Sequence, residues 1–257
     1  MVRIARAQMI FAAVVVLLFA ASAAATALRY TSMSAMNGTP MPGGWTLSAA
    51  WLPLCGRTWL QTAASFISMW ATMMPAMMLP ALAPMLWRVR ESPDIQSGLL
   101  IISGAAGYFS VWLLAGSVLF PLGAALASLA VHLPALARAA PLAAGVVVLV
   151  AGVLQCTSWK TRRLACCRSL RACHHASPAS VVDAMREGTR LAIRCGLCCS
   201  NWMAVLLAAG VMDRHATLIV SAAIAIERIA SARQPLVRLA GIASIAAGGM
   251  LIARAIR

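Results

Sequence analysis

The chain has 257 residues, of which 62% are hydrophobic and only 11% are charged, and its formal net charge is +15. Soluble domains carry about 25% charged residues, so this composition excludes a soluble globular protein. The basic residues punctuate apolar runs instead of lining one face, which argues against nucleic-acid binding and indicates membrane topology. We therefore expect an all-α, polytopic transmembrane helical bundle that contacts the lipid bilayer and no nucleic acid.

Apolar runs long enough to cross a bilayer, which takes about 20 residues per helix, recur along the whole chain. We expect one integral membrane domain, 1–257, made of a first span or signal-like segment, an outer loop and a six-span bundle; these parts cover residues 1–28, 29–58 and 59–254. Small residues at 21–27 also allow cleavage of the first segment as a secretory signal. The expected spans are about seven and cover residues 8–28, 59–87, 97–120, 139–156, 191–211, 216–229 and 235–253.

The distribution of the 21 Lys and Arg residues predicts the orientation of these spans. With seven spans and the N-terminus inside, most of the basic residues lie in short loops on the cytoplasmic side, as the positive-inside rule requires. Lys160 is counted among these loop charges. We expect the N-terminus in, the C-terminus out, and residence in the bacterial cytoplasmic (inner) membrane.

The second expected span contains an unusual stretch, M-W-A-T-M-M-P-A-M-M-L-P-A-L-A-P, at residues 69–84. On a helix, one tryptophan and four methionines fall on a single face, at i, i+3, i+4, i+7 and i+8; these are Trp70, Met73, Met74, Met77 and Met78. Methionine fills irregular gaps between helices, but its thioether is also a soft donor suited to Cu(I). Prolines at positions 75, 80 and 84 remove backbone donors and favour a kink.

The fifth expected span repeats this spacing with Cys195, Cys198, Cys199, Trp202 and Met203. Two sulfur-lined helices could therefore face one another across the bundle. Clustered thiols on the cytoplasmic side are normally reduced, and reduced cysteines in such clusters are suited to metal binding or redox chemistry.

The basic loop before the fifth span contains a second group of possible ligands, Cys166, Cys167, Cys173, His174 and His175. The two histidines of this loop are weaker candidates than the cysteines, because they are also consistent with a solvated segment.

Four other polar side chains have simpler interpretations. We interpret His132 and His215 as interface residues and Asp213 as a turn residue. Glu227 lies in an apolar run, where burial is costly unless it is paired. It is either a snorkelling partner of Arg228 or a functional residue.

Several of these motifs resemble a bacterial family of predicted metal-binding integral membrane proteins, domain of unknown function 2182. The resemblance covers residues 70–228 and is carried by W-A-T-M-M-P-A-M-M-L-P, by C195-x-x-C198-C199 with Met203, and by Cys167 in the basic loop. It implies a multi-pass membrane protein with a metal site. The candidate metal ligands are Met73, Met74, Met77, Met78, Cys167, Cys195, Cys198, Cys199 and Met203.

Two classes of function follow from these residues. The first is a Cu(I) carrier, permease or metalloenzyme assembly factor, with copper as the metal and a metal chaperone or metalloenzyme as partner; Met33, Met36 and Met41 are then possible capture ligands in the outer loop. The second is a membrane thiol-disulfide oxidoreductase that uses Cys195, Cys198 and Cys199. A noncatalytic membrane subunit is the third possibility. We favour copper handling without catalysis, because redox chemistry gives no reason for the methionines.

Overall fold

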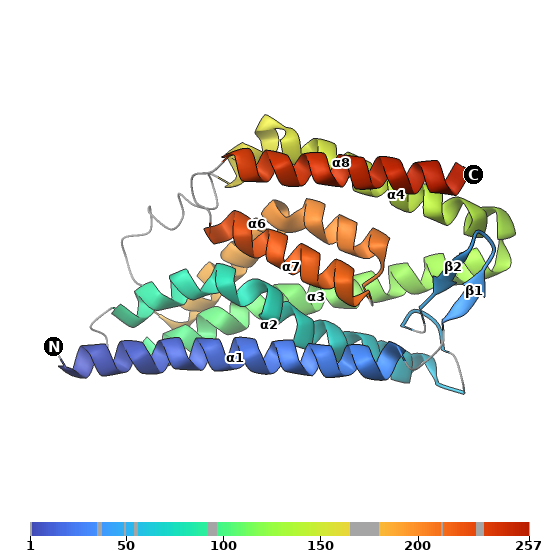
Figure 1. Ribbon diagram of the computed structural model, residues 1–257. Helices are drawn as coiled ribbons and strands as arrows, with labels where there is room; N and C mark the ends of the chain where they lie inside the picture. Colours follow the sequence, from blue (N-terminus) through green and yellow to red (C-terminus); the bar gives the residue numbers. More distant parts are fainter. Residues whose placement is uncertain are drawn as a thin grey trace.

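The computed structural model is a bundle of long helices with one short β-hairpin, which confirms the expected all-α polytopic fold (Figure 1). It describes residues 2–34, 38–48, 50–53, 56–91, 97–164, 180–211, 213–229 and 234–256. The helices are α1 (Val2–Ser34), α2 (Trp59–Glu91), α3 (Ser97–His132), α4 (Pro134–Cys156), α6 (Val181–Ala209), α7 (Arg214–Ile229) and α8 (Gln234–Ile256). Residues 158–164 are also helical. The hairpin pairs β1 (Thr39–Met41) with β2 (Trp45–Leu47) in antiparallel register.

Six helices in the described part of the chain are long and apolar enough to cross a membrane; these spans are Gln8–Thr31, Trp59–Pro80, Gly98–His132, Pro134–Cys156, Val181–Ala209 and Pro235–Ile256. The sixth expected span, 216–229, is a real helix, α7, but it has only 16 residues. At 1.5 Å per residue it is about 24 Å long, shorter than a hydrocarbon core of about 30 Å. The two chain ends nevertheless lie at opposite ends of the bundle (Figure 1). The assignment of those ends to the two sides of the membrane stays a prediction.

Two boundaries differ from the expected ones for local reasons. Helix α3 continues through Pro121 to His132, so the turn into α4 comes at Leu133 instead of near residue 120. Helix α6 begins ten residues early because Ser180 caps it: the Ser180 hydroxyl accepts a hydrogen bond of 3.1 Å from the Asp183 N–H. The three prolines of α2 likewise do not end that helix, which is continuous from Trp59 to Glu91.

Glycine residues allow two pairs of helices to pack with their backbones in close contact. A Cβ atom placed on Gly188 of α6 would lie 2.0 Å from the Gly104 carbonyl oxygen of α3, and one on Gly107 would lie 2.2 Å from the Met185 carbonyl oxygen. Helices α4 and α8 approach in the same way at Gly152, where a Cβ would lie 2.7 Å from the backbone nitrogen of Ile245. Small residues allow such backbone contacts between membrane helices. They bring α3 and α6 close enough for their side chains to share one interior.

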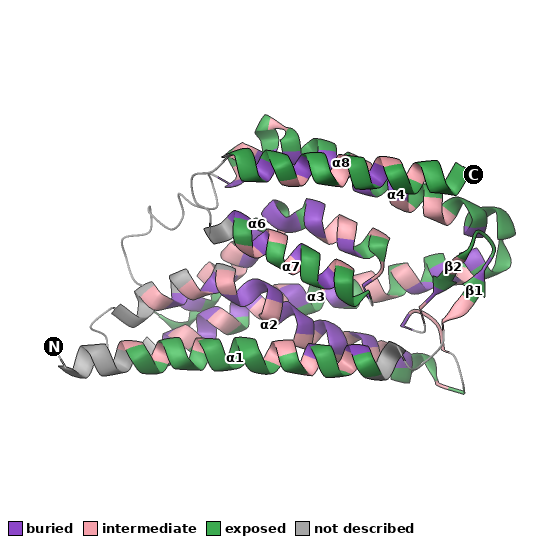
Figure 2. Cartoon of the chain, viewed as in Figure 1, coloured by how far each residue is buried: buried purple, intermediate pink, exposed green. Residues whose placement is uncertain are grey.

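The buried interior lies on α2, α3, α6 and α7, whereas α1 and α8 are largely exposed (Figure 2). Half of the apolar window of α2 is buried, against 6% for α1. The exposed surface of the outer helices is rich in leucine, isoleucine and valine, the composition of a surface that faces lipid. Helix α2, with its methionines, therefore forms the centre of the protein.

The hairpin covers the turn between α3 and α4. The indole N–H of Trp45 donates a hydrogen bond of 2.8 Å to the Ala137 carbonyl oxygen. Met41 is buried in the small cluster beneath it, so this methionine packs against the turn instead of standing open to solvent as a capture ligand. The side chains of Met33 and Met36 are outside the described residues.

Candidate metal centre

All four methionines of the α2 stripe are buried, with exposed fractions of 2% or less. They belong to one hydrophobic cluster with Trp70 and with Cys195 and Cys199 of α6. Their spacing on the helix does place them toward the protein interior, and none of the four faces lipid. Three of them nevertheless lie in two different surroundings: Met78 lies against α6, whereas Met73 and Met77 lie toward α1 and α7.

The first surrounding is a sulfur cluster between α2 and α6. The Sγ of Cys195 lies 3.8 Å from the Sδ of Met78 and 4.0 Å from the Sγ of Cys199. Both cysteines are reduced, and they are 1% and 3% exposed. The two sulfur-lined faces expected from the sequence therefore meet at this point.

Tyr108 of α3 completes the surroundings of this cluster. Its hydroxyl donates a hydrogen bond of 3.1 Å to the Sγ of Cys195, and its side chain is fully buried. Sequence reasoning did not assign Tyr108 to the site. The available signal was a tyrosine in the middle of an apolar span, since a buried phenol requires a hydrogen-bond partner.

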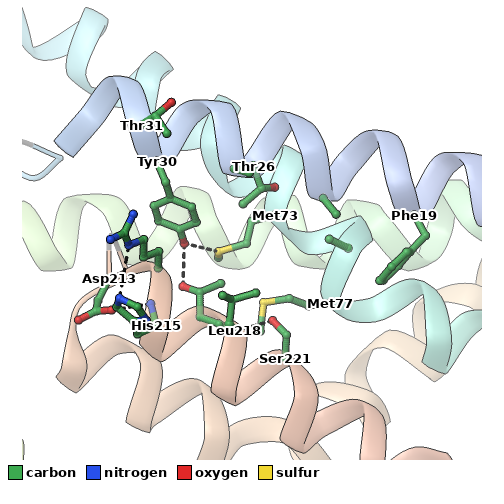
Figure 3. A pocket seen from close by; sticks show the side chains of 15 residues that line it. Phe19, Thr26, Tyr30, Thr31, Met73, Met77, Asp213, His215, Leu218 and Ser221 are labelled. Atoms are coloured by element: carbon green, nitrogen blue, oxygen red, sulfur yellow. Dashed lines mark hydrogen bonds between the residues drawn. The ribbon is translucent and has the colours of Figure 1, made fainter. Parts of the chain in front are cut away.

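The second surrounding is a cavity of about 650 Å³ between α1, α2 and α7, which Met73 and Met77 line (Figure 3). The hydroxyl of Tyr30 lies 3.6 Å from the Sδ of Met73, 2.9 Å from the Val211 carbonyl oxygen and 2.7 Å from the Thr217 hydroxyl. These contacts tie the end of α1 to the start of α7. The methionine stripe on one face of α2 is thus divided between a packed cluster and an open space.

The cavity also has charged residues at the turn between α6 and α7. Asp213 caps α7, because its Oδ1 accepts hydrogen bonds of 2.7 Å and 3.0 Å from the backbone N–H groups of His215 and Ala216. This agrees with the interpretation of Asp213 as a turn residue. The Nε2 of His215 accepts a hydrogen bond of 3.4 Å from the Nε of Arg214. His215, expected only at the membrane interface, thus lines the same cavity as the two methionines.

The remaining predicted ligands have other contacts or lie outside the described residues. Cys198 is disulfide-bonded, and its Sγ lies 3.3 Å from the Arg163 carbonyl oxygen. Met203 is half-buried and packs against the hydrophobic cluster, while Met74 is buried within it. Cys167, with the rest of the loop 165–179, lies outside the described residues.

No metal site built from hard or borderline ligands is present in the described residues, because no three His, Cys, Asp or Glu side chains gather there at a suitable spacing. The described residues instead bring together the sulfur atoms of Met78, Cys195 and Cys199. Thioethers and thiols are soft donors, which fit Cu(I) and do not fit magnesium or calcium.

A charged network lies on the other side of α6. The ammonium group of Lys160, fully buried, forms an ion pair of 3.0 Å with Glu227 and donates a hydrogen bond of 2.7 Å to the Cys198 carbonyl oxygen. The Glu227 carboxylate also accepts hydrogen bonds from the Trp202 indole, at 2.7 Å, and from the Gln155 amide. Asn201 donates a hydrogen bond of 3.3 Å to Gln155.

This network corrects two expectations. Glu227 is bound inside the bundle instead of reaching the membrane edge as a snorkelling residue, and Lys160 is a buried cation instead of a loop charge. The reason is that residues 158–164 form a helix that brings Lys160 against α6, where a charge is tolerated only with a well-placed partner.

Comparison with known proteins points to copper. The model of the PpoB2 family, described as copper chaperone, matches residues 67–251. Neither a curated protein nor a solved structure gives a match. The matched range contains the methionines of α2 and the cysteines of α6. The family that matches is thus described by copper, and it does not carry the name of the uncharacterised family that the sequence motifs resemble. Because the match covers well over half of the chain, this protein belongs to the PpoB2 copper chaperone family.

Proposed function

We propose that this protein is an integral membrane copper chaperone that holds Cu(I), its cargo, between Met78, Cys195 and Cys199. The observation that carries the proposal is the spacing of the three sulfur atoms, 3.8 Å and 4.0 Å from the central Cys195. A metal–sulfur bond is about 2.3 Å long, as in zinc sites, so two sulfurs that share an ion lie at most about 4.6 Å apart. Both separations from Cys195 lie within that limit.

The surroundings of the cluster suit a soft monovalent ion. The three side chains are buried among apolar groups, so hard cations would lose their water without gaining oxygen ligands. A thiol must lose its proton to bind metal, and the Tyr108 hydroxyl is placed to donate a hydrogen bond to the resulting thiolate of Cys195. Met74 lies in the same hydrophobic cluster and Met203 packs against it, so both supply further thioethers near this centre.

The family description favours delivery of copper to a metalloenzyme or to another copper carrier over catalysis. We infer that the protein works in the bacterial cytoplasmic membrane as a carrier or assembly factor. The six apolar spans support the membrane location, and the distribution of basic residues supports the orientation with the N-terminus inside.

The test is a Cu(I) titration of the purified, reduced protein in detergent against a competing chelator. We expect one tightly bound ion per chain, and we expect Cys195→Ser to weaken binding by at least about 10–100-fold, the loss seen when even an outer partner of a metal ligand is removed. Met78→Leu should weaken binding less, since one neutral thioether is lost.

Two matched substitutions serve as controls. Met69→Leu makes the same change at another buried methionine of α2, and Cys156→Ser makes it at an exposed, reduced cysteine of α4. Both should bind Cu(I) like the unaltered protein. Unchanged affinity in Cys195→Ser and in Met78→Leu would refute this assignment of the ligands.

The disulfide at Cys198 favours a second candidate function, thiol–disulfide exchange, because reduced thiols flank it in the same helix. Under that function, Cys198→Ser would trap a mixed disulfide between a thiol of this chain and a partner protein. Under the copper function, Cys198→Ser should leave Cu(I) affinity close to that of the unaltered protein. Alkylation of trapped cells followed by non-reducing electrophoresis separates the two.

A further inference from the structure

The cavity between α1, α2 and α7 is lined by charged side chains and by thioethers, and helix packing alone does not require such a lining. It has a volume of about 650 Å³ and is lined by side chains of all three helices. We propose that this cavity is the access route by which Cu(I) reaches the cluster of Met78, Cys195 and Cys199, with Met73 and Met77 as its first ligands. The proposal rests on the copper function proposed above and adds a path to it.

The lining of the cavity changes from one end to the other. Asp213, Arg214 and His215 line it at the turn between α6 and α7, where α7 begins. Met73 and Met77 line it from the middle of α2 (Figure 3). A charged rim that leads to thioethers suits a cation that must lose water and gain soft ligands, and the imidazole of His215 is itself a copper donor.

Two consecutive residues of α2 connect the cavity with the cluster. Met77 lines the cavity, and the next residue, Met78, places its sulfur 3.8 Å from the Sγ of Cys195. Consecutive residues of an α-helix point about 100° apart because a turn holds 3.6 residues. The pair Met77–Met78 therefore presents one thioether on each side of the wall that separates the cavity from the cluster.

The chemistry of the ligands gives the route a direction. Met73 and Met77 are neutral and bind Cu(I) without losing a proton, so an ion held by them can move on. Cys195 and Cys199 bind as thiolates, whose negative charge holds the ion more strongly in a buried site. Transfer from the cavity to the cluster is then favourable.

A paired substitution in α1 tests the route. Ala23 lines the cavity, while its neighbour Ala24 is exposed on the outer surface. Cu(I) is presented as its coloured bicinchoninate complex, and the rate of its loss and the final amount bound are measured separately. We expect Ala23→Phe to slow loading by about tenfold or more, equivalent to about 1.4 kcal/mol in the barrier, with the final amount unchanged, and Ala24→Phe to load at the unaltered rate.

A second pair of variants keeps the test independent of how α1 tolerates phenylalanine. Met73→Leu combined with Met77→Leu conserves side-chain volume and should also slow loading without lowering the final amount bound, whereas Met69→Leu should change neither. Unaltered loading rates in Ala23→Phe and in the double methionine variant, with normal final binding, would overturn the route alone. Absence of bound Cu(I) in the unaltered protein would overturn the copper function and the route with it.

Discussion

Helix α6 separates two regions of opposite chemistry with a single stretch, residues 195–202. On one side, Cys195 and Cys199 meet Met78 in a cluster of neutral sulfur atoms. On the other side, the Cys198 carbonyl and Trp202 meet the ion pair of Lys160 and Glu227. The charged side already has each charge matched by a partner, so it serves as a structural support. The sulfur side carries donors without charge and is therefore able to accept a cation.

The largest expected effect is on the charged side. Glu227→Ala would leave the Lys160 ammonium buried without its carboxylate, and removing one partner of a buried ion pair costs about 3–5 kcal/mol. Chemical or thermal unfolding in detergent measures this loss. The Cu(I) affinity of the folded fraction should stay close to the unaltered value, since no ligand is touched.

An exposed ion pair in the same helix provides the control. Glu187 and Arg190 lie 3.8 Å apart with side chains 26% and 66% exposed, so Glu187→Ala should cost no more than about 1 kcal/mol. Equal losses of stability in Glu187→Ala and Glu227→Ala would show that the buried network is not a structural support.

An intermediate effect is expected where α3 and α6 touch. Gly188→Ala would place a Cβ 2.0 Å from the Gly104 carbonyl oxygen, and relieving such a backbone contact forces the helices apart at a cost of about 1–3 kcal/mol. Because Tyr108 and Cys195 bond across this interface, Cu(I) affinity should fall as well. Unfolding and Cu(I) titration measure the two effects.

Gly249 of α8 is the matched control for this substitution. A Cβ there meets nothing within 4 Å, and alanine is a better helix former than glycine by about 1 kcal/mol, so Gly249→Ala should be neutral or stabilising. If Gly188→Ala and Gly249→Ala behave alike, close packing of α3 on α6 does not support the sulfur cluster.

The smallest expected effect is that of Tyr108→Phe. The variant keeps the ring and removes one hydrogen bond to Cys195, worth about 0.5–1.5 kcal/mol. Cu(I) affinity should therefore fall only about 2–10-fold, measured by chelator competition. Tyr30→Phe removes a hydroxyl from the cavity and not from the cluster, so it should leave the final affinity unchanged; an equal loss in both variants would argue against a specific role for Tyr108.

Features that follow from the helical period or from composition could be predicted from the sequence. Contacts between residues that are far apart in the sequence could not. The helical character, the burial of Met73 to Met78 and the spacing of Cys195 with Cys199 follow from apolar runs and from the period of the helix. The neighbouring helices decide which methionine contacts a cysteine. Met78 therefore lies against Cys195, whereas Met73 and Met77 of the same stripe line the cavity.

The ion pair of Lys160 and Glu227 shows the same limit more sharply. Its members lie in different helical segments, 67 positions apart, and no local pattern links them. Each residue alone resembled a common interfacial charge. The number of spans was predicted less well, because the apolar run at 216–229 does not show that α7 is only 16 residues long.

The same ion pair also orders the assembly of the protein in time. Lys160 is synthesised first, and its carboxylate partner follows 67 residues later, which takes roughly 3–13 s at about 5–20 residues per second. During that interval the segment after α4 cannot place its cation in the apolar interior without cost. The packing of residues 158–164 against α6 must therefore await the insertion of α7, so the charged support of α6 is completed late in biogenesis.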